Sequence, residues 1–142
     1  MSVKTAKPFV NSVISDAAEH DSSWVDIAQY DAFTVYLGAV KTLLPGDLTL
    51  SLRVSGSPAS ELNDDEAGHA IITYDKLLTA AGTDAPASSA TRSADGGLTA
   101  SKSPEDVIRS VSLRLQAASG DPGNFWTANV FWAARRSIDT KN

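Results

Sequence analysis

Two strand-like runs in the last third of the chain, residues 107–117 and 125–136, constrain the fold most. Residues 120–123 between them read Gly-Asp-Pro-Gly, a composition typical of turns. In the first run Leu113 and Leu115 alternate with Arg114 and Gln116, the two-residue period of a strand with one buried face. We therefore expect the two runs to form one large antiparallel hairpin.

The second run carries bulky side chains on both of its faces. One face holds Trp126, Ala128, Val130, Trp132 and Ala134, and the other holds Phe125, Thr127, Asn129, Phe131 and Ala133. Such a strand needs at least partial cover on both sides, and no reactive group lies next to it in the sequence. It indicates packing against a core and a neighbour, not chemistry.

Further short strands are expected at residues 11–14, 24–27, 32–40, 47–54 and 70–74, with a weak helical turn at 75–81 and a polar loop at 61–68. Short strands separated by turns predict an all-β fold, an antiparallel β-sandwich of jelly-roll or immunoglobulin-like order. By length, residues 13–142 form a single domain. Residues 1–12 are read as an N-terminal arm or an edge strand.

Residues 79–104 are unusually poor in large side chains. Nineteen of these twenty-six residues are Ala, Ser, Thr or Gly, and Leu98 is the only large apolar one. Such a segment buries too little surface to offset its own ordering entropy. We expect a long flexible loop, either a plain surface loop or an arm that orders on a neighbour.

Composition excludes several classes of protein. Cysteine is absent, which excludes disulfides, thiolate nucleophiles and Cys-bound metals. The net charge of −5 divides into +2 for residues 1–10, −9 for 11–75 and +2 for 76–142, so no basic cluster favours nucleic acid. No segment approaches the ~20 apolar residues of a membrane span, and a soluble protein that binds no membrane is expected.

Chemical motifs are equally scarce. His20 and His69 lie among acids, but no metal-ligand spacing surrounds them, and no nucleophile or phosphate-binding motif occurs. We therefore expect no catalytic, cofactor-binding or metal residues, and no enzyme. Trp24 and Tyr30 are the better candidates for a sugar-stacking platform.

Three stretches carry a resemblance to a known family. They are DIAQYDAFTVYLGA, PGDLTLSLRVSGSPASE and, after the small-residue segment, VIRSVSLRLQAASGDPGNFWTANVFWAARR. Over residues 24–136 this layout resembles the capsid decoration, or cement, proteins of tailed bacteriophages that are built on a β-sandwich. The resemblance implies a non-enzymatic virion protein, made in the host bacterial cytoplasm, that binds the major capsid protein on the capsid surface as a dimer or trimer.

Contact residues follow from that reading. Lys4, Lys7 and Phe9 are the expected capsid contacts, and Phe131 and Arg135 are the expected contacts between protomers. Two alternatives stay open. One is a carbohydrate-binding or receptor-binding β-sandwich module, and the other is a head–tail connector or tail component.

Overall fold

The computed structural model describes residues 2–27, 30, 32–41, 46–80, 84–93, 109–121 and 123–136. Strands dominate these ranges, and the helix within them, α1 (Ala59–Asp64), has six residues. The strands are β1 (Ser2–Ile14), β2 (His20–Asp21), β3 (Val25–Asp26), β4 (Ala32–Lys41), β5 (Leu48–Ser55), β6 (Ile71–Ala80), β7 (Asp84–Ser93), β8 (Ser110–Ala117) and β9 (Trp126–Arg136). The expected all-β class is confirmed.

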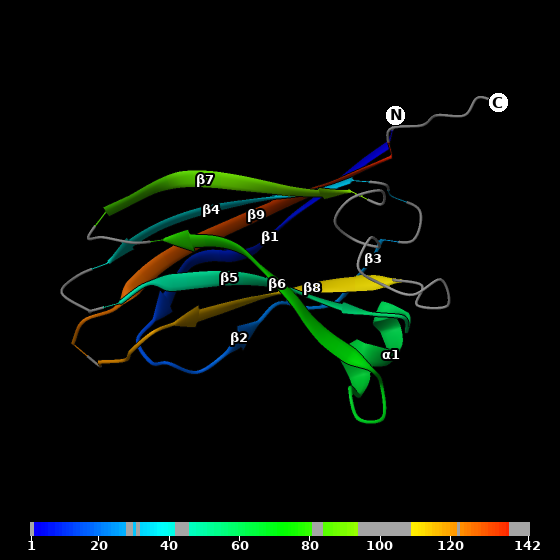
Figure 1. Ribbon diagram of the computed structural model, residues 1–142, viewed down its shortest axis with the longest axis horizontal. Helices are drawn as coiled ribbons and strands as arrows, with labels where there is room; N and C mark the ends of the chain where they lie inside the picture. The colour runs from blue at the N-terminus through cyan, green and yellow to red at the C-terminus, as the bar shows by residue number, and fades with distance from the viewer. Residues whose placement is uncertain are drawn as a thin grey trace.

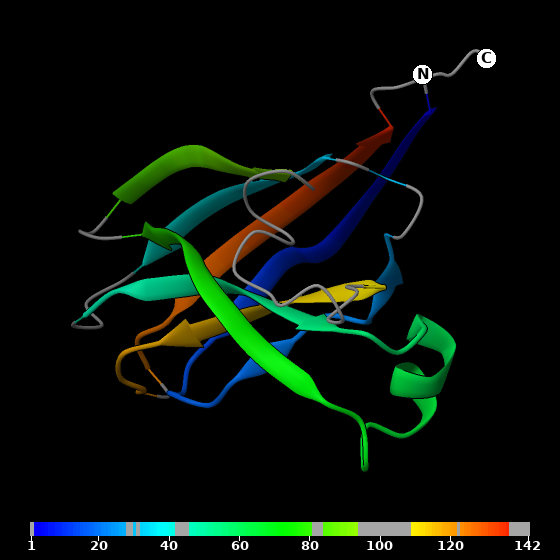
Figure 2. The same ribbon diagram turned by 45° about the vertical axis from the view of Figure 1, so that its right-hand side comes forward.

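The strands pair antiparallel and fall into two sheets (Figure 1). The first sheet has the order β1-β9-β4-β7, and the second has the order β2-β8-β5-β6, with β3 also paired to β8. Figure 2 shows α1 beyond the end of β5, where the chain leaves the second sheet. Among the described residues no helix has the length and apolar character needed to cross a bilayer.

One hydrophobic core takes buried side chains from both sheets. From β5, the alternating residues Leu48, Leu50, Leu52 and Val54 are all buried, as their period predicts. From β9, the face expected to be apolar is buried in full: Trp126, Ala128, Val130, Trp132 and Ala134. The rings of Phe33 on β4 and Trp132 on β9 lie 5.3 Å apart within this core.

The expected hairpin of β8 and β9 is wrong. β8 lies in the second sheet, paired with β2, β3 and β5, whereas β9 lies in the first sheet between β1 and β4. The turn between them crosses from one sheet to the other, and the Asp121 N–H donates to the Ser15 carbonyl at 2.8 Å. A turn sequence specifies a reversal of the chain but not the strand edge that each arm joins. Here the two strands join different sheets, and the apolar faces of both are buried in the same core.

The small-residue segment is also not loop throughout. Residues 84–93 form β7, an edge strand paired antiparallel with β4 with one register shift, while residues 79–80 end β6. The rest of the 79–104 segment lies outside the described residues. A strand ladder is made of backbone hydrogen bonds, so a segment without large side chains forms one once β4 offers it an edge.

Two further local expectations are corrected. Residues 75–80 continue strand β6 instead of forming a helical turn, and the helix lies at Ala59–Asp64, partly within the expected polar loop. Leu62 is the reason, because α1 buries it together with Ala59 and Trp24 in a small second cluster. Residues 2–14 form the edge strand β1, one of the two readings open at this end of the chain.

β1 is irregular, and this irregularity shapes the surface described below. Its register with β9 shifts twice, between Ala6 and Phe9 and between Phe9 and Ser12. Asn11 adopts a positive φ of 46°, which asparagine tolerates better than most residues. The Asn11 N–H donates to Asn129 Oδ1 at 2.9 Å. A side chain of β9 thus provides the hydrogen-bond acceptor that this backbone group lacks at the bulge.

The crossing turn yields a first prediction. A Cβ at Gly120 would lie 2.5 Å from Asp16 Cα and 2.9 Å from the Ser15 carbonyl oxygen, both backbone atoms that cannot easily move. Gly120→Ala is therefore expected to lower the free energy of unfolding by about 1–3 kcal/mol, measured by urea denaturation. Gly123→Ala is the matched control, because its nearest contact is Asp121 Oδ1 at an ordinary 3.6 Å. Equal effects of the two substitutions would contradict the tight crossing.

Candidate functional site

The outward-pointing residues of β1, β9 and β4 form an apolar surface. Side chains alternate along a strand, so the residues between the buried ones point away from the core. Among the side chains that the structure describes, the exposed large hydrophobic ones all lie on β1 or β4: Val10 (58% exposed), Val13 (57%), Tyr36 (42%) and Val40 (54%). With Lys7, Asn129 and Phe131 they make up the surface that we call the β1–β9–β4 face.

Strand register arranges this face in rows across the sheet. Val13 and Val40 both lie opposite Thr127, on the two sides of β9. The next row places Gly38 opposite Asn129, and the following row places Tyr36 opposite Phe131. The rings of Tyr36 and Phe131 lie 5.4 Å apart and tilted by 39°, within the range of favourable aromatic pairs.

A hollow of about 330 Å³ opens in the middle of the face. Gly38 leaves room there because it has no side chain, and the bulged backbone of β1 curves around the opposite side. The lining residues are Lys7, Phe9, Val10, Tyr36, Gly38, Asn129, Val130 and Phe131. The hollow is thus mostly apolar, with one amide and one ammonium group at its margin.

The residues expected from the sequence divide between this hollow and one end of the same strands. Lys7, Phe9 and Phe131 line the hollow together, so expected capsid and protomer contacts share one site. Lys4 lies opposite Ala134, and Arg135 lies opposite Ala32; both charged side chains are exposed. Phe9 is half-buried and packs against the core, so it also has a structural role.

Sequence reasoning missed Tyr36, Val10, Gly38 and Asn129 as members of this site. The period of β4 did place Tyr36 opposite the buried Phe33, Val35 and Leu37, which was the available signal. The period of β9 likewise placed Asn129 on the face of Phe131, whereas Val10 carried no signal, because the bulges of β1 decide what lies beside it.

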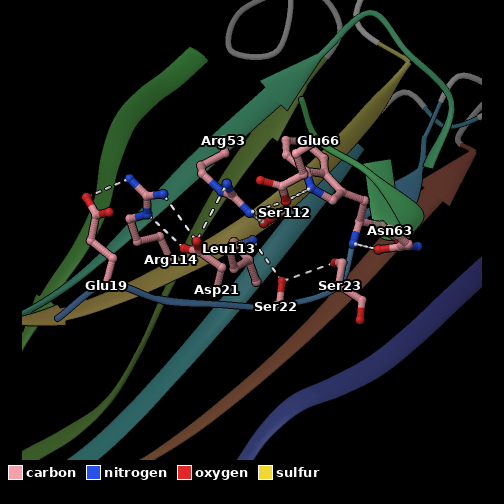
Figure 3. Close-up of polar contacts among 11 residues, drawn as sticks. Glu19, Asp21, Ser22, Ser23, Arg53, Asn63, Glu66, Ser112, Leu113 and Arg114 are labelled. Carbon is pink, nitrogen blue, oxygen red and sulfur yellow. Dashed lines mark hydrogen bonds and ion pairs between the residues drawn. The ribbon is translucent and has the colours of Figure 1, made fainter. Parts of the chain in front are cut away.

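A second cluster, polar and largely structural, covers the outside of the second sheet (Figure 3). The Arg53 side chain, only 4% exposed, donates to Ser112 Oγ at 2.9 Å and lies 3.6 Å from Asp21 Oδ2 and 3.7 Å from Glu66 Oε2. Asp21 also accepts from Arg114 Nε at 2.7 Å, and this bond raises the pKa of Arg114. The cluster ties residues 19–24 and the α1 segment to the sheet.

Trp24 belongs to this cluster, which removes it as a sugar platform. It is 4% exposed, its indole Nε1 donates to Glu66 Oε2 at 2.9 Å, and the Arg53 guanidinium lies 4.7 Å from its ring centroid. Tyr30, the other candidate, is half-buried against the core. Among the side chains that the structure describes, the exposed aromatic one is instead Tyr36, with Phe131 half-buried beside it.

One arrangement has the composition of a catalytic triad but not its geometry. Ser57 Oγ lies 2.8 Å from His69 Nδ1, and Glu61 Oε1 lies 3.9 Å from the same nitrogen. A serine–histidine–acid relay uses both ring nitrogens, one for each partner. Because both contacts meet Nδ1, this histidine does not link Ser57 to Glu61. The described residues also contain no group of three His, Asp or Glu side chains placed to hold a metal.

Charge is distributed very unevenly between the two sides of the molecule. Strands β1, β4 and β9 contain no acidic residue, but they contain Lys4, Lys7, Lys41, Arg135 and Arg136. Residues 15–27 and 59–69, on the side of the second sheet, contain no Lys or Arg. Their eight acids are Asp16, Glu19, Asp21, Asp26, Glu61, Asp64, Asp65 and Glu66. The fold therefore places these bases on strands of the first sheet and these acids on the side of the second sheet. Pairing sets Lys4 opposite the buried Ala134, whereas Arg135 takes the alternate, outward position and Lys7 lines the hollow.

The Arg53 cluster leads to a second prediction. Arg53→Met keeps much of the volume but leaves Ser112 Oγ without its buried donor and places an apolar chain beside two carboxylates. We expect a loss of about 1–3 kcal/mol in the free energy of unfolding, measured by urea denaturation. Arg53→Lys should not restore the lost stability. An ammonium group cannot make the planar, two-pronged hydrogen bonds of a guanidinium or stack on an aromatic ring as it does.

Arg114→Met is the control for this substitution. Its ion-pair partners Glu19 and Asp21 are 51% and 30% exposed, so water takes over their solvation when the guanidinium is removed. The expected cost is below about 1 kcal/mol. A larger loss for Arg114→Met than for Arg53→Met would contradict the assignment of Arg53 as the centre of the cluster.

The exposed pair of Asp16 and His20 gives a third prediction. The bond between His20 Nε2 and Asp16 Oδ1, at 2.8 Å, and then the Ala18 N–H lower the pKa of Asp16 below its ordinary 3.8. The stabilisation from Asp16 is therefore complete above its unfolded pKa and is lost as the pH falls through the lower folded pKa. His20→Ala should raise the Asp16 pKa part of the way back, since the Ala18 bond remains, as measured by carboxyl NMR titration.

Asp121 is the internal control in the same titration. Its pKa is also lowered, but by the Gly123 N–H first and by Asn124 second. His20→Ala should leave that pKa unchanged. A parallel shift of both carboxyl groups would mean that a general change of the fold, not the loss of one hydrogen bond, had moved them.

No protein-family model matches this chain, and no curated protein sequence matches it. A functional assignment therefore depends on the layout of the sequence and on the two surfaces described above.

Proposed function

We propose that the two sheets are the layers of a jelly-roll β-sandwich. The nesting of the strand pairs supports this: β1 pairs with β9, β2 and β3 with β8, β4 with β7, and β5 with β6. The chain thus follows the path of one long hairpin wound around a common core. An immunoglobulin-like order would instead place the first two strands side by side, whereas here β1 and β2 lie in different sheets.

We propose that the protein is a non-enzymatic virion structural protein of a tailed phage that binds the outer capsid surface and stabilises subunit junctions. The observation that carries this proposal is the β1–β9–β4 face, an apolar surface around a hollow. Exposed apolar patches on soluble domains mark sites of association. Jelly rolls occur in viral capsid domains, which is support by analogy of fold only.

The same proposal includes its partner and its place. The partner is the major capsid protein, the protein acts as a homodimer or homotrimer, and it is made in the bacterial cytoplasm and ends on the virion. Modest contacts are sufficient in this role, because many linked copies on one shell gain from avidity.

A carbohydrate-binding or receptor-binding module is the second candidate. It is favoured by the Tyr36 and Phe131 rings beside the Asn129 amide, since a flat ring and an amide are what a sugar contacts. Jelly rolls also include lectin domains. This candidate uses the same hollow but expects a small polar ligand in it.

A fourth prediction tests these candidates by stoichiometry. Purified particles that contain the protein should contain it in a molar ratio comparable to that of the major shell protein, measured by quantitative mass spectrometry. Protein added back to particles stripped of it should sediment with them, and a glycan array should give no signal. A few copies per particle would instead identify a connector or tail component, and glycan binding at the hollow would identify the second candidate.

A further inference from the structure

We infer that the β1–β9–β4 face docks a different protein whose surface is acidic and presents an apolar side chain to the hollow. This inference rests on the proposed function, in which that protein is the shell subunit, and names the docking face and the chemistry of its partner. It also moves Phe131 from an expected protomer contact to a contact with the partner.

The apolar part of the recognition comes from the hollow. Tyr36, Phe131, Phe9 and Val10 are all lining residues, and the cavity of about 330 Å³ is large enough to take one large side chain. Tyrosine at such a position is a frequent source of binding energy, because it buries much surface at little entropic cost. The Asn129 amide at the margin adds a polar group that orients what enters.

The acidic character of the partner follows from charge complementarity. Lys7 lines the hollow, Arg135 is exposed at an outward position further along β9, and no acid occurs on β1, β4 or β9. Lys4 is not part of this set, because it lies opposite the buried Ala134. This basic surface belongs to a chain of net charge −5, so its sign is opposite to that of the whole molecule. Complementary potentials across an interface guide association and select the partner.

A second copy of this chain fits the face poorly in either orientation. Face-to-face packing would bring the Lys7 and Arg135 groups of two copies onto one interface, to which β1, β4 and β9 contribute no acid. Head-to-tail packing would set the face against residues 15–27 and 59–69, which are acidic but have no exposed large hydrophobic side chain. Only a partner with both properties complements the face.

The size of the face agrees with binding in many copies. The ten residues of β4 span about 33 Å at roughly 3.3 Å each, and three strands cover a width of about 14 Å. The resulting area of about 450 Å² is smaller than the roughly 800 Å² per partner of a stable interface. One contact is therefore weak, and occupancy of a lattice depends on linked copies.

The fifth prediction is tested on the full chain with two peptides. One alternates glutamate and leucine around a central phenylalanine, and the other has lysine in place of glutamate. NMR titration at low salt should shift the amide signals of Tyr36, Asn129 and Phe131 with the acidic peptide only. The shifts should disappear at ~1 M salt, where the Debye length is about 3 Å.

Variants locate the interaction. Lys7→Glu and Tyr36→Thr should each weaken acidic-peptide binding by about tenfold, equivalent to roughly 1.4 kcal/mol. Threonine keeps strand propensity at the exposed Tyr36, so the fold is preserved. Arg109→Glu is the matched control: it makes the same charge change at an exposed residue just before β8, outside the face, and should bind as the wild type does.

Binding to stripped shells separates the two proposals. Peptide binding at the face without shell binding would leave the docking inference standing and reject the decoration function. Shell binding that Lys7→Glu and Tyr36→Thr do not weaken would keep the function and overturn the inference. Equal shifts with both peptides, no shifts with the acidic one, or self-association that Tyr36→Thr abolishes would likewise overturn it.

Discussion

Burial of one face of β9 is the constraint on which the rest of the structure depends. Trp126, Val130 and Trp132 are buried in the core that takes side chains from both sheets, and β1 and β4 pair on either side of this strand. Because the period of a strand is two residues, this burial also decides which side chains point outward. Asn129 and Phe131 point outward because the residues that alternate with them are buried in the core. A register slip of one residue would bury Asn129 and Phe131 and expose the tryptophans.

The outer surfaces of the two sheets are completed in different ways. On the second sheet, Arg53 gathers Asp21, Glu66 and Ser112 and holds the α1 segment against β5 and β8. Most of the polar groups there are paired with one another. On the first sheet, the described outward residues of β1, β9 and β4 include exposed apolar side chains and a hollow. The outer surface of the second sheet is structural, because its polar side chains bond to one another. The exposed apolar surface of the first sheet is the one that we propose for binding.

The two sheets also differ in the charges that they carry. The acids of residues 15–27 and 59–69 lie with the second sheet, and the bases of β1, β4 and β9 lie with the first. Lys7 and Arg135 therefore give the hollow side a basic character, and in our proposal a partner with an acidic surface is attracted to that side. For a decoration protein this would orient each copy on the shell before close contact forms.

Local periodicity was enough to predict the all-β class, the clearly alternating strands and most of the core. The alternation in β5, the apolar face of β9 and the outward position of Tyr36 can all be read from neighbouring residues, because burial on one side of a strand imposes a period of two. Lys7, Phe9 and Phe131, which the sequence analysis named as contact candidates for other reasons, lie among the residues that line the hollow.

Pairing between distant segments was decided only in the tertiary structure. The separation of β8 from β9, the strand made by residues 84–93 and the burial of Trp24 under Arg53 each depend on a partner far away in the chain. The hollow is of the same kind, since it arises where the bulges of β1 meet Gly38 of β4 across β9. A single sequence determines which residues seek burial, but the choice among possible neighbours is a property of the whole packed chain.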